Sequence, residues 1–264
     1  MSEIALSLGG YEVIAHLSRT RRLDTYEVWS RERACSCVVK TLRPDRRDDE
    51  RARAALLSEG RLLIALAHPH IVRGYELIEE PEPAVVMETL DGETLAHLID
   101  RHEHGLPPED VAWLGLHVAS ALRYLHGHGI LHLDVKPSNV VAEAGRAKLI
   151  DLSLARPPGR YRVGLGTWCN LSPEQARGDE LGEPADVWGL GTVLYEAATG
   201  LPAFDGEDEF PQLTGPAPAT SGVPEELAAA IDACLAFEAS ERPSLTELAA
   251  LLTPLAPGAR PWDG

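Results

Sequence analysis

The sequence predicts an α+β protein with two lobes, a small β-rich lobe followed by a larger helical lobe. The first sign is a series of short strand-like segments separated by charged turns, at residues 11–17, 25–29, 35–42, 71–78 and 84–89. The second is one amphipathic helix over residues 48–66, with acidic residues first and leucines at helical spacing after them. The third is a change of character after Asp91–Gly92, beyond which apolar helices are predicted at residues 111–126, 186–199, 225–237 and 244–252.

The expected organisation is one domain over residues 1–264. Its first lobe covers about 1–90 and its second about 92–253, with a hinge at 88–91. A short Pro/Gly tail is expected at 254–264, and the Pro/Gly-rich stretch 201–224 is predicted to be a loop.

Composition excludes several classes of protein. With 44% hydrophobic residues the chain can bury a core, so it is not a disordered protein. No apolar run is long enough to span a bilayer, and residues 1–10 lack the pattern of a signal peptide, which predicts a cytoplasmic protein with no membrane partner. The four cysteines have no metal-ligand spacing and are expected to be free thiols.

The net charge of −17 is unevenly distributed. Residues 1–90 hold 13 Lys/Arg against 15 Asp/Glu, whereas residues 91–264 hold 11 against 26. Such an acidic second half argues against binding of nucleic acid or anionic membranes. It either attracts a basic peptide substrate or is simply a solvated acidic face.

Lysine is rare in this chain. Only Lys40, Lys136 and Lys148 are lysines among 24 basic residues, and the rest are arginines. Where arginine supplies generic positive charge, a retained lysine suggests a need for a compact ammonium group.

Catalytic side chains are concentrated in the segment 132–139, HLDVKPSN. It places a carboxylate (Asp134), an ammonium (Lys136) and an amide (Asn139) on one loop, and Asp151 follows a predicted strand at 147–150. Oxygen ligands from Asn139 and Asp151 suit Mg²⁺. Asp134 can accept a hydroxyl proton, and Lys136 can neutralise a transferring phosphoryl group.

On these residues the chain resembles the protein kinase family, specifically the eukaryotic-like (Hanks-type) bacterial serine/threonine kinases, from about Tyr11 to Leu252. The resemblance implies the two-lobed protein kinase fold, ATP and Mg²⁺ as cofactors (with Mn²⁺ as a substitute), and serine or threonine of a protein as acceptor. It implies that Asp134 is the catalytic base, that Lys136 stabilises the γ-phosphate, and that Asn139 and Asp151 are the metal ligands.

The resemblance extends to the nucleotide site. Lys40, in Cys37-Val-Val-Lys40, is similar to the lysine that holds the α- and β-phosphates, and Glu59 is placed to pair with it unless it is only an exposed helix charge. The residues implied around adenine are Leu17, Thr25, Val38, Met87, Val141 and the hinge Glu88 to Leu90.

Later motifs resemble architectural parts of the family. Gly166-Thr167 and Ser172-Pro-Glu174 are similar to the end of the activation segment, and Asp186 to the helix start that braces the catalytic loop. Arg242 is expected to form a buried ion pair with Glu174.

The phosphate-covering loop departs from the family pattern. Ser18, Thr20 and Leu23 stand where glycines are expected, and the loop carries arginines instead, at Arg19, Arg21 and Arg22. Either these arginines replace backbone amides as phosphate ligands, or the segment is an exposed basic turn over a weakened nucleotide site. Thr25 and the bulkier Val38 also predict weaker ATP binding.

Other departures concern regulation and packing. Leu133 replaces the arginine that commonly meets a phosphate on the activation loop, and between Asp151 and Gly166 the only hydroxyl side chains are Ser153 and Tyr161. These two facts predict an enzyme that is not switched on by activation-loop phosphorylation. Ser153, in place of a glycine, is expected to stiffen the metal-binding turn, and Gly74 is expected to leave a hole in the internal apolar stack.

Histidines are not expected to take part in the chemistry. His132 is predicted to be a core residue beneath Asp151-Leu152. The others considered are predicted to lie on the surface without metal-binding geometry: His102, His104, His126 and His128.

Three functions compete. The first is an active serine/threonine protein kinase, because the five residues that touch ATP, metal or acceptor in the family's catalytic template are retained. The second is a pseudokinase that serves as a binding or regulatory module, with or without nucleotide, motivated by the altered phosphate loop, Leu133, Ser153 and Gly74. The third, a small-molecule phosphotransferase, is disfavoured by the Ser172–Glu174, Asp186-Val-Trp and Arg242 features. The oligomeric state is not predicted.

Overall fold

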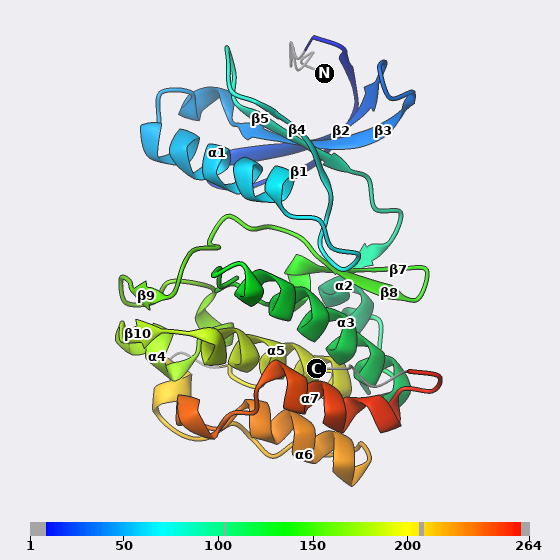
Figure 1. Cartoon of the computed structure of the whole chain (residues 1–264), viewed down its shortest axis with the longest axis vertical. Helices are drawn as coiled ribbons and strands as arrows, with labels where there is room; N and C mark the ends of the chain where they lie inside the picture. The colour runs from blue at the N-terminus through cyan, green and yellow to red at the C-terminus, as the bar shows by residue number, and fades with distance from the viewer. Residues whose placement is uncertain (1–8, 103, 206–208, 260–264) are drawn as a thin grey trace. The chain divides into compact units, whose positions relative to one another are not determined.

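The structure is a computed structural model that describes residues 9–102, 104–205 and 209–259. The chain divides into two compact units, residues 1–91 and 92–264 (Figure 1). Parts of three segments considered above lie outside the described residues, namely the N-terminus 1–10, the predicted loop 201–224 and the tail 254–264.

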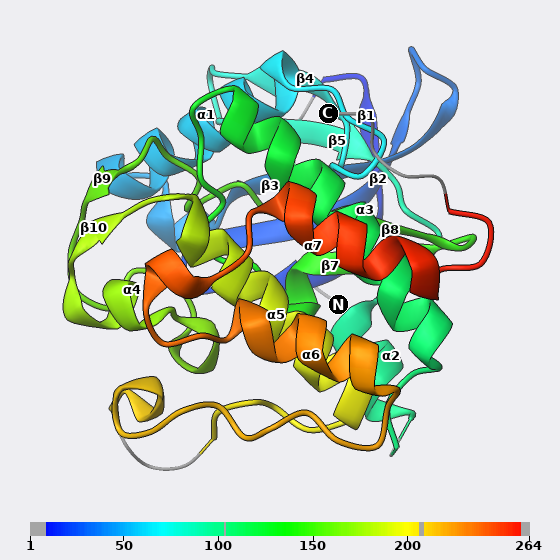
Figure 2. The ribbon, with the colours of Figure 1, turned by 60° about the horizontal axis from the view of Figure 1, so that its bottom comes forward.

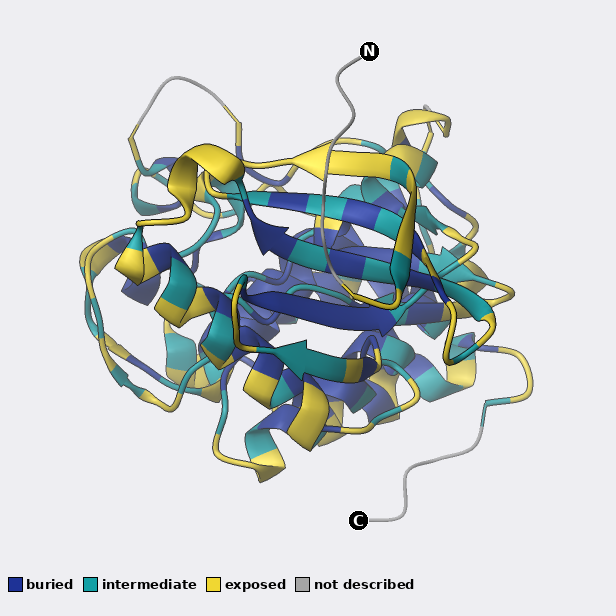
Figure 3. Cartoon of the chain, turned by 90° about the horizontal axis from the view of Figure 1, so that it is seen from above, coloured by how far each residue is buried: buried dark blue, intermediate teal, exposed yellow. Residues whose placement is uncertain are grey.

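A five-stranded antiparallel sheet forms most of the first unit, in the order β1-β2-β3-β5-β4. Burial increases across the sheet, from a largely exposed β1 to a buried β5 (Figure 3). One face carries an apolar core of Tyr26, Val28, Cys37, Val39, Ala84 and Val86. The strands are β1 (Tyr11–Arg19), β2 (Leu23–Ser30), β3 (Cys35–Leu42), β4 (Gly74–Ile78) and β5 (Ala84–Glu88).

Helix α1 (Glu50–Ala65) packs on the sheet through β3, β4 and β5. Asp49 caps it by accepting a hydrogen bond from the Ala52 N–H at 3.0 Å. Side chains alternate between the two faces of a strand, so residues such as Lys40 face α1 while the neighbouring Val39 joins the core on the other face. Figure 1 shows α1 lying along the sheet.

Two glycines let α1 approach the sheet closely. A Cβ on Gly60 would lie 2.5 Å from Leu77, and a Cβ on Gly74 would lie 2.8 Å from the backbone of Leu63. The expectation that Gly74 leaves a hole is therefore wrong, because the backbone of α1 occupies the space that a larger side chain would need.

His68, in the segment after α1, gives the first unit a pH dependence. Burial and the neighbouring His70 lower the pKa of His68 to about 4 from its ordinary 6.5, and its Nδ1 accepts the His70 N–H at 3.2 Å. As the pH decreases, His68 is therefore protonated in the unfolded chain before it is protonated in the folded one. The free energy of unfolding should thus fall as the pH decreases from about 6.5 towards about 4. Melting temperatures measured between pH 7 and pH 4 should fall less steeply for His68→Asn than for the wild type, whereas His104→Asn should keep the wild-type slope. An unchanged slope in His68→Asn would contradict this.

The second unit is mainly helical. Figure 2 shows α3, α5, α6 and α7 close together, and α5 packs against both α3 and α6. Helices α4 and α7 begin with capping boxes, Ser172 with Gln175 and Ser244 with Glu247. The helices are α2 (Leu95–Asp100), α3 (Pro108–Gly127), α4 (Pro173–Arg177), α5 (Glu183–Thr199), α6 (Glu225–Cys234) and α7 (Leu245–Leu252).

Short strands complete this unit. They are β6 (Glu93–Thr94), β7 (Val140–Glu143) and β8 (Arg146–Leu149) in one sheet, and β9 (Gly159–Arg160) paired with β10 (Glu180–Leu181). The α+β prediction and the long helices are confirmed. The short helices α2 and α4 were not predicted, since neither is long enough for apolar periodicity to be visible.

The cysteines and the apolar helices were also considered from composition. All four cysteines are free. Among the helices of residues 9–102, 104–205 and 209–259, none combines the length and apolar character needed to cross a bilayer.

Candidate active site

In the first unit, β3 and α1 bring Lys40 and Glu59 together. The Lys40 Nζ lies 2.7 Å from the Glu59 Oε1. The Glu59 side chain is fully buried, and that of Lys40 is only 12% exposed. The reading of Glu59 as an exposed helix charge is thus wrong. A buried carboxylate that orients an ammonium is the arrangement needed to present one positive charge at a fixed place.

The residues expected around adenine in this unit lie along neighbouring strands. Val38 is directly opposite Met87 in the β3–β5 pair, and Thr25 is opposite Lys40 in the β2–β3 pair. Leu17 lies at a β-bulge of β1 and is 53% exposed. Val38, Thr25 and Lys40 alternate with core residues, so they share the sheet face that α1 packs on.

The expected hinge begins at the end of β5. Glu88 uses its backbone N–H for the Arg73 carbonyl at 2.9 Å, so this group is not available to a purine. Leu90 is half-buried, and its amide makes no hydrogen bond within the part of the chain that the structure describes. In the second unit, Val141 is buried on β7.

The catalytic loop of the second unit forms a closed polar network around Asp134. The Thr167 hydroxyl donates to the Asp134 Oδ1 at 2.6 Å, and the Lys136 Nζ lies 2.8 Å from Oδ2. Lys136 also donates to the Thr167 hydroxyl oxygen at 2.7 Å. Asn139 donates from Nδ2 to both Oδ2 and the main-chain carbonyl of Asp134, at 3.0 and 2.9 Å. These bonds fix the direction of the carboxylate.

Asn139 and Asp151 come together because they flank two paired strands. Asn139 immediately precedes β7, Asp151 follows β8, and the Ile150 N–H donates to the Asn139 carbonyl at 2.9 Å. The Asn139 Nδ2 donates to Asp134, so the Oδ1 of the same Asn139 amide points away from Asp134. Asp151 is held with φ 68° and accepts the Ser153 N–H on Oδ1 at 3.0 Å. One amide oxygen and one carboxylate fit a hard cation such as Mg²⁺.

The substitution at Ser153 is accommodated. The left-handed backbone conformation of this turn falls on Asp151, and Ser153 is not among the residues with positive φ. A side chain at position 153 therefore costs no backbone strain.

Asp186, in the first turn of α5, holds the backbone of the catalytic loop by hydrogen bonds. Its carboxylate accepts the N–H groups of His132 and Leu133 at 2.8 and 2.7 Å and contacts the His126 Nε2 at 2.8 Å. Burial alone would raise the pKa of Asp186, but the His126 contact and these N–H groups bring it below its ordinary value. His126 was expected on the surface, and this is wrong: its side chain is 4% exposed because it partners a buried carboxylate. His132 is fully buried, as a core residue should be.

Leu133 anchors the catalytic loop to the activation segment by apolar contact. It is 3% exposed and belongs to a cluster with Leu131, Leu165, Leu181 and Ala185. Its backbone has φ 62°. The side chain therefore occupies buried apolar space and offers no charge to a phosphate.

Gln175 ties the same region together through the backbone. Its Nε2 donates to the carbonyls of Leu133 and Leu165 at 3.0 and 2.7 Å. Leu133 precedes Asp134, and Leu165 precedes Gly166-Thr167. The buried Gln175 amide therefore fixes the distance between the two segments that carry the catalytic network.

Arg242 and Glu174 form the expected ion pair. Two parallel contacts join them, Nη1 to Oε1 at 2.6 Å and Nη2 to Oε2 at 2.9 Å. The remaining N–H groups of Arg242 donate to the carbonyls of Pro184, Ala236 and Phe237.

Comparison with known proteins identifies the class of this chain. The protein kinase domain family matches residues 21–251, so the chain belongs to the protein kinase family. Among its relatives is the serine/threonine-protein kinase PknB of Mycobacterium leprae, 36% identical over 215 residues that cover 76% of this chain and 32% of that protein. Another is the serine/threonine-protein kinase PkaA of Streptomyces coelicolor, 34% identical over 235 residues that cover 84% of this chain and 43% of that protein. The chain thus spans about a third to two fifths of these relatives' length.

Sequence reasoning missed several residues that position the site. Thr167 was noted only as part of a motif, yet it bonds both Asp134 and Lys136. Gln175 and His126 were not given their roles as buried partners. The hydrogen bonds of Gln175 and His126 join segments that are between 10 and 60 residues apart, so no local pattern could reveal them.

Proposed function

We propose that this domain is a protein kinase that transfers the γ-phosphoryl group of ATP to a serine or threonine hydroxyl of a protein. The Asp134–Thr167–Lys136–Asn139 network is the observation that carries the proposal, because it pairs a base with a cation on one fixed loop. The Lys40–Glu59 pair of the first unit supports it by presenting a second oriented ammonium. The bacterial relatives are named as serine/threonine kinases, which favours those acceptors.

In the proposed reaction, the acceptor hydroxyl oxygen attacks the γ-phosphorus and its proton passes to Asp134. The bond from the γ-phosphorus to the β,γ-bridging oxygen breaks, and ADP leaves. Lys136 would neutralise charge on the transferring group, and Lys40 charge on the α- and β-phosphates. Asn139 and Asp151 would hold Mg²⁺, which supplies further neutralisation of the triphosphate when bound. The net negative charge of residues 91–264 would attract a basic protein, so such a protein is expected to be the better substrate.

A labelled-phosphate assay tests the proposal. The purified 264-residue chain, incubated with Mg²⁺ and γ-labelled ATP, should label itself or a generic acceptor such as casein or myelin basic protein. Phosphoamino-acid analysis should find phosphoserine or phosphothreonine. Absence of transfer to any of these acceptors, in a protein that melts cooperatively, would overturn the kinase activity.

A pseudokinase is the second candidate, and one observation favours it. The β1–β2 turn, Thr20–Arg22, contains no glycine, so the loop that commonly covers the phosphates is chemically altered. A pseudokinase would show no transfer in the labelling assay. A melting temperature raised by Mg-ATP would then distinguish a nucleotide-binding module from one without nucleotide.

The structure also supports activity that is independent of activation-loop phosphorylation. Leu133 is buried among apolar residues, and β9 is already paired with β10. Phosphatase treatment should therefore leave the specific activity within about twofold, since no arginine follows His132 to be paired with a phosphate. The double variant Ser153→Ala/Tyr161→Phe should behave like the wild type. A large loss of activity after phosphatase treatment would contradict this expectation.

A further inference from the structure

The backbone amides of the β1–β2 turn are already used within the turn. The Leu23 N–H donates to the Thr20 hydroxyl oxygen at 3.0 Å, and the Arg22 N–H donates to the same atom at 3.4 Å. The Thr20 N–H donates to the Leu23 carbonyl at 2.8 Å. A glycine-rich phosphate loop works by pointing free amides at the anion. This turn does not have those three amides to offer.

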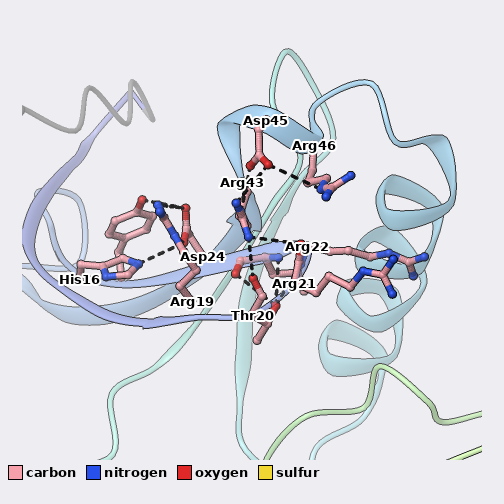
Figure 4. Close-up of polar contacts among 11 residues, drawn as sticks. His16, Arg19, Thr20, Arg21, Arg22, Asp24, Arg43, Asp45 and Arg46 are labelled. Carbon is pink, nitrogen blue, oxygen red and sulfur yellow. Dashed lines mark hydrogen bonds and ion pairs between the residues drawn. The ribbon is translucent and has the colours of Figure 1, made fainter.

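Arg43, just beyond β3, fixes the turn in place. Its N–H donates to the Arg22 carbonyl at 3.0 Å, and its Nη1 lies 3.3 Å from the Thr20 carbonyl and 3.5 Å from the Arg21 carbonyl. Asp45 orients this guanidinium through two contacts of 2.9 and 3.0 Å. Figure 4 shows Arg43 between Asp45 and the turn. Every carbonyl of the turn thus faces the Arg43 side, and the turn has a defined conformation without glycine.

A second set of side-chain contacts joins β1 and β2 next to the turn, on the face of the sheet opposite to α1. Asp24, whose side chain is fully buried, accepts two hydrogen bonds from Arg19 at 2.7 and 3.0 Å and contacts the His16 Nε2 at 3.1 Å. These contacts help lower the pKa of Asp24, the Arg19 hydrogen bond most of all. Arg19 is therefore a structural residue, and of the three arginines in the altered loop only Arg21 and Arg22 are left for a ligand.

Those two arginines project together towards α1. Figure 4 shows both side chains leaving the turn in the same direction, away from Arg19 and Asp24. The Arg22 Nε forms an ion pair with the Asp49 Oδ2 at 3.6 Å, a separation longer than a hydrogen bond. The Arg21 guanidinium makes no hydrogen bond or ion pair within the described residues. Both side chains are exposed, and of the two only Arg22 has an ion-pair partner among the described residues, so Arg21 carries a positive charge that no neighbouring side chain there neutralises.

The direction of these side chains relates them to Lys40. Asp49 is the N-cap of α1, and α1 carries the Glu59 that holds Lys40. Arg22 immediately precedes β2 and is three residues from Thr25, the residue opposite Lys40, a separation of about 10 Å for extended backbone. Lys40 and Arg22 thus both reach α1, at Glu59 and at Asp49, and Arg21 points the same way as Arg22 (Figure 4), so three cationic side chains lie on the α1 side of one sheet, which suits an extended polyanion.

We propose that Arg21 and Arg22 bind the terminal phosphates of the nucleotide, so that guanidinium groups replace the amides of a glycine-rich loop. This inference rests on the proposed ATP-dependent function. Arginine matches phosphate by paired N–H donors, and it can do so from a turn whose backbone is occupied. Binding by exposed side chains is weakened by salt, since their charges are screened.

Nucleotide binding by variants tests the inference. Dissociation constants for Mg-ATP, Mg-ADP and adenosine are measured by calorimetry on the full 264-residue chain at low and high salt. Arg21→Ala/Arg22→Ala should weaken Mg-ATP binding at least tenfold, weaken Mg-ADP binding less, change adenosine binding by under twofold, and reduce the salt dependence. Arg31→Ala is the matched control, because Arg31 is an exposed arginine at the other end of β2, paired with Glu12; it should bind all three ligands like the wild type.

The outcomes separate the two proposals. A wild-type chain that binds no Mg-ATP removes the proposed function, and the inference with it. Normal Mg-ATP binding by the wild type and by the double variant overturns only the inference. An equal loss for adenosine and Mg-ATP also overturns it, because the arginines would then support the fold of the hairpin and not the phosphates. Circular dichroism and melting curves verify that the variants fold, as expected for two exposed side chains.

Discussion

Replacing Asp134 by asparagine should lower the rate of phosphoryl transfer by about 10³-fold, because an amide cannot take the acceptor proton. The variant should still bind Mg-ATP, since Lys40, Asn139 and Asp151 are unchanged. Asparagine keeps only one of the two oxygens of Asp134, which accept from Thr167 on Oδ1 and contact Lys136 and Asn139 through Oδ2, so the network also loses at least one of these contacts. The measurement is the initial rate of labelled-phosphate transfer at saturating ATP, together with the nucleotide dissociation constant.

The matched control is Asp110→Asn, the same chemical change at an exposed position in the first turn of α3. It should leave the rate of transfer within about twofold. Activity of Asp134→Asn within tenfold of the wild type would exclude Asp134 as the base. A parallel loss of nucleotide binding in this variant would instead point to a structural role in the catalytic loop.

The sequence was sufficient for the elements whose pattern is long or periodic. Strand β3 was predicted with its observed bounds, and α1, α3 and α5 within a few residues. The pairing of Lys40 with Glu59 was expected from the resemblance to protein kinases, and the structure brings the two side chains together.

Other features depend on contacts that no local pattern encodes. His126 was assigned to the surface because its sequence context shows no metal-binding geometry, yet it lies against Asp186, sixty residues later in the chain. Gly74 was expected to leave a hole because volume alone was considered, whereas the backbone of α1 moves into that space. Both errors arise from tertiary packing, which decides burial after the secondary structure has formed.

The altered phosphate loop shows a related limit. Its lack of glycine was evident from the sequence, but the sequence alone could not separate structural from available arginines. The coordinates make that separation: Arg19 is committed to Asp24 and Arg43 to Asp45.

Loss of the Arg242–Glu174 pair should have the largest effect on stability. Arg242→Met is expected to cost about 3–5 kcal/mol in the free energy of unfolding, because Glu174 is left as a buried charge without its partner. The carbonyls of Pro184, Ala236 and Phe237 lose their donor as well. Urea titration followed by tryptophan fluorescence measures this change, and one of the chain's five tryptophans, Trp188, has its ring centroid 4.9 Å from the Arg242 Cζ.

Two further variants separate the charge from the hydrogen bonds. Glu174→Gln keeps an acceptor for Arg242 and removes the carboxylate, so it leaves the cation unpaired and should also destabilise the protein. Arg242→Met/Glu174→Leu removes both charges and should recover part of the stability lost in Arg242→Met, since a buried pair is commonly no more stabilising than apolar packing. If Arg242→Met costs less than about 1 kcal/mol, the pair is not needed for stability. If the double variant is no more stable than Arg242→Met, the loss comes from the three carbonyls and not from the unpaired carboxylate, because those hydrogen bonds are missing in both.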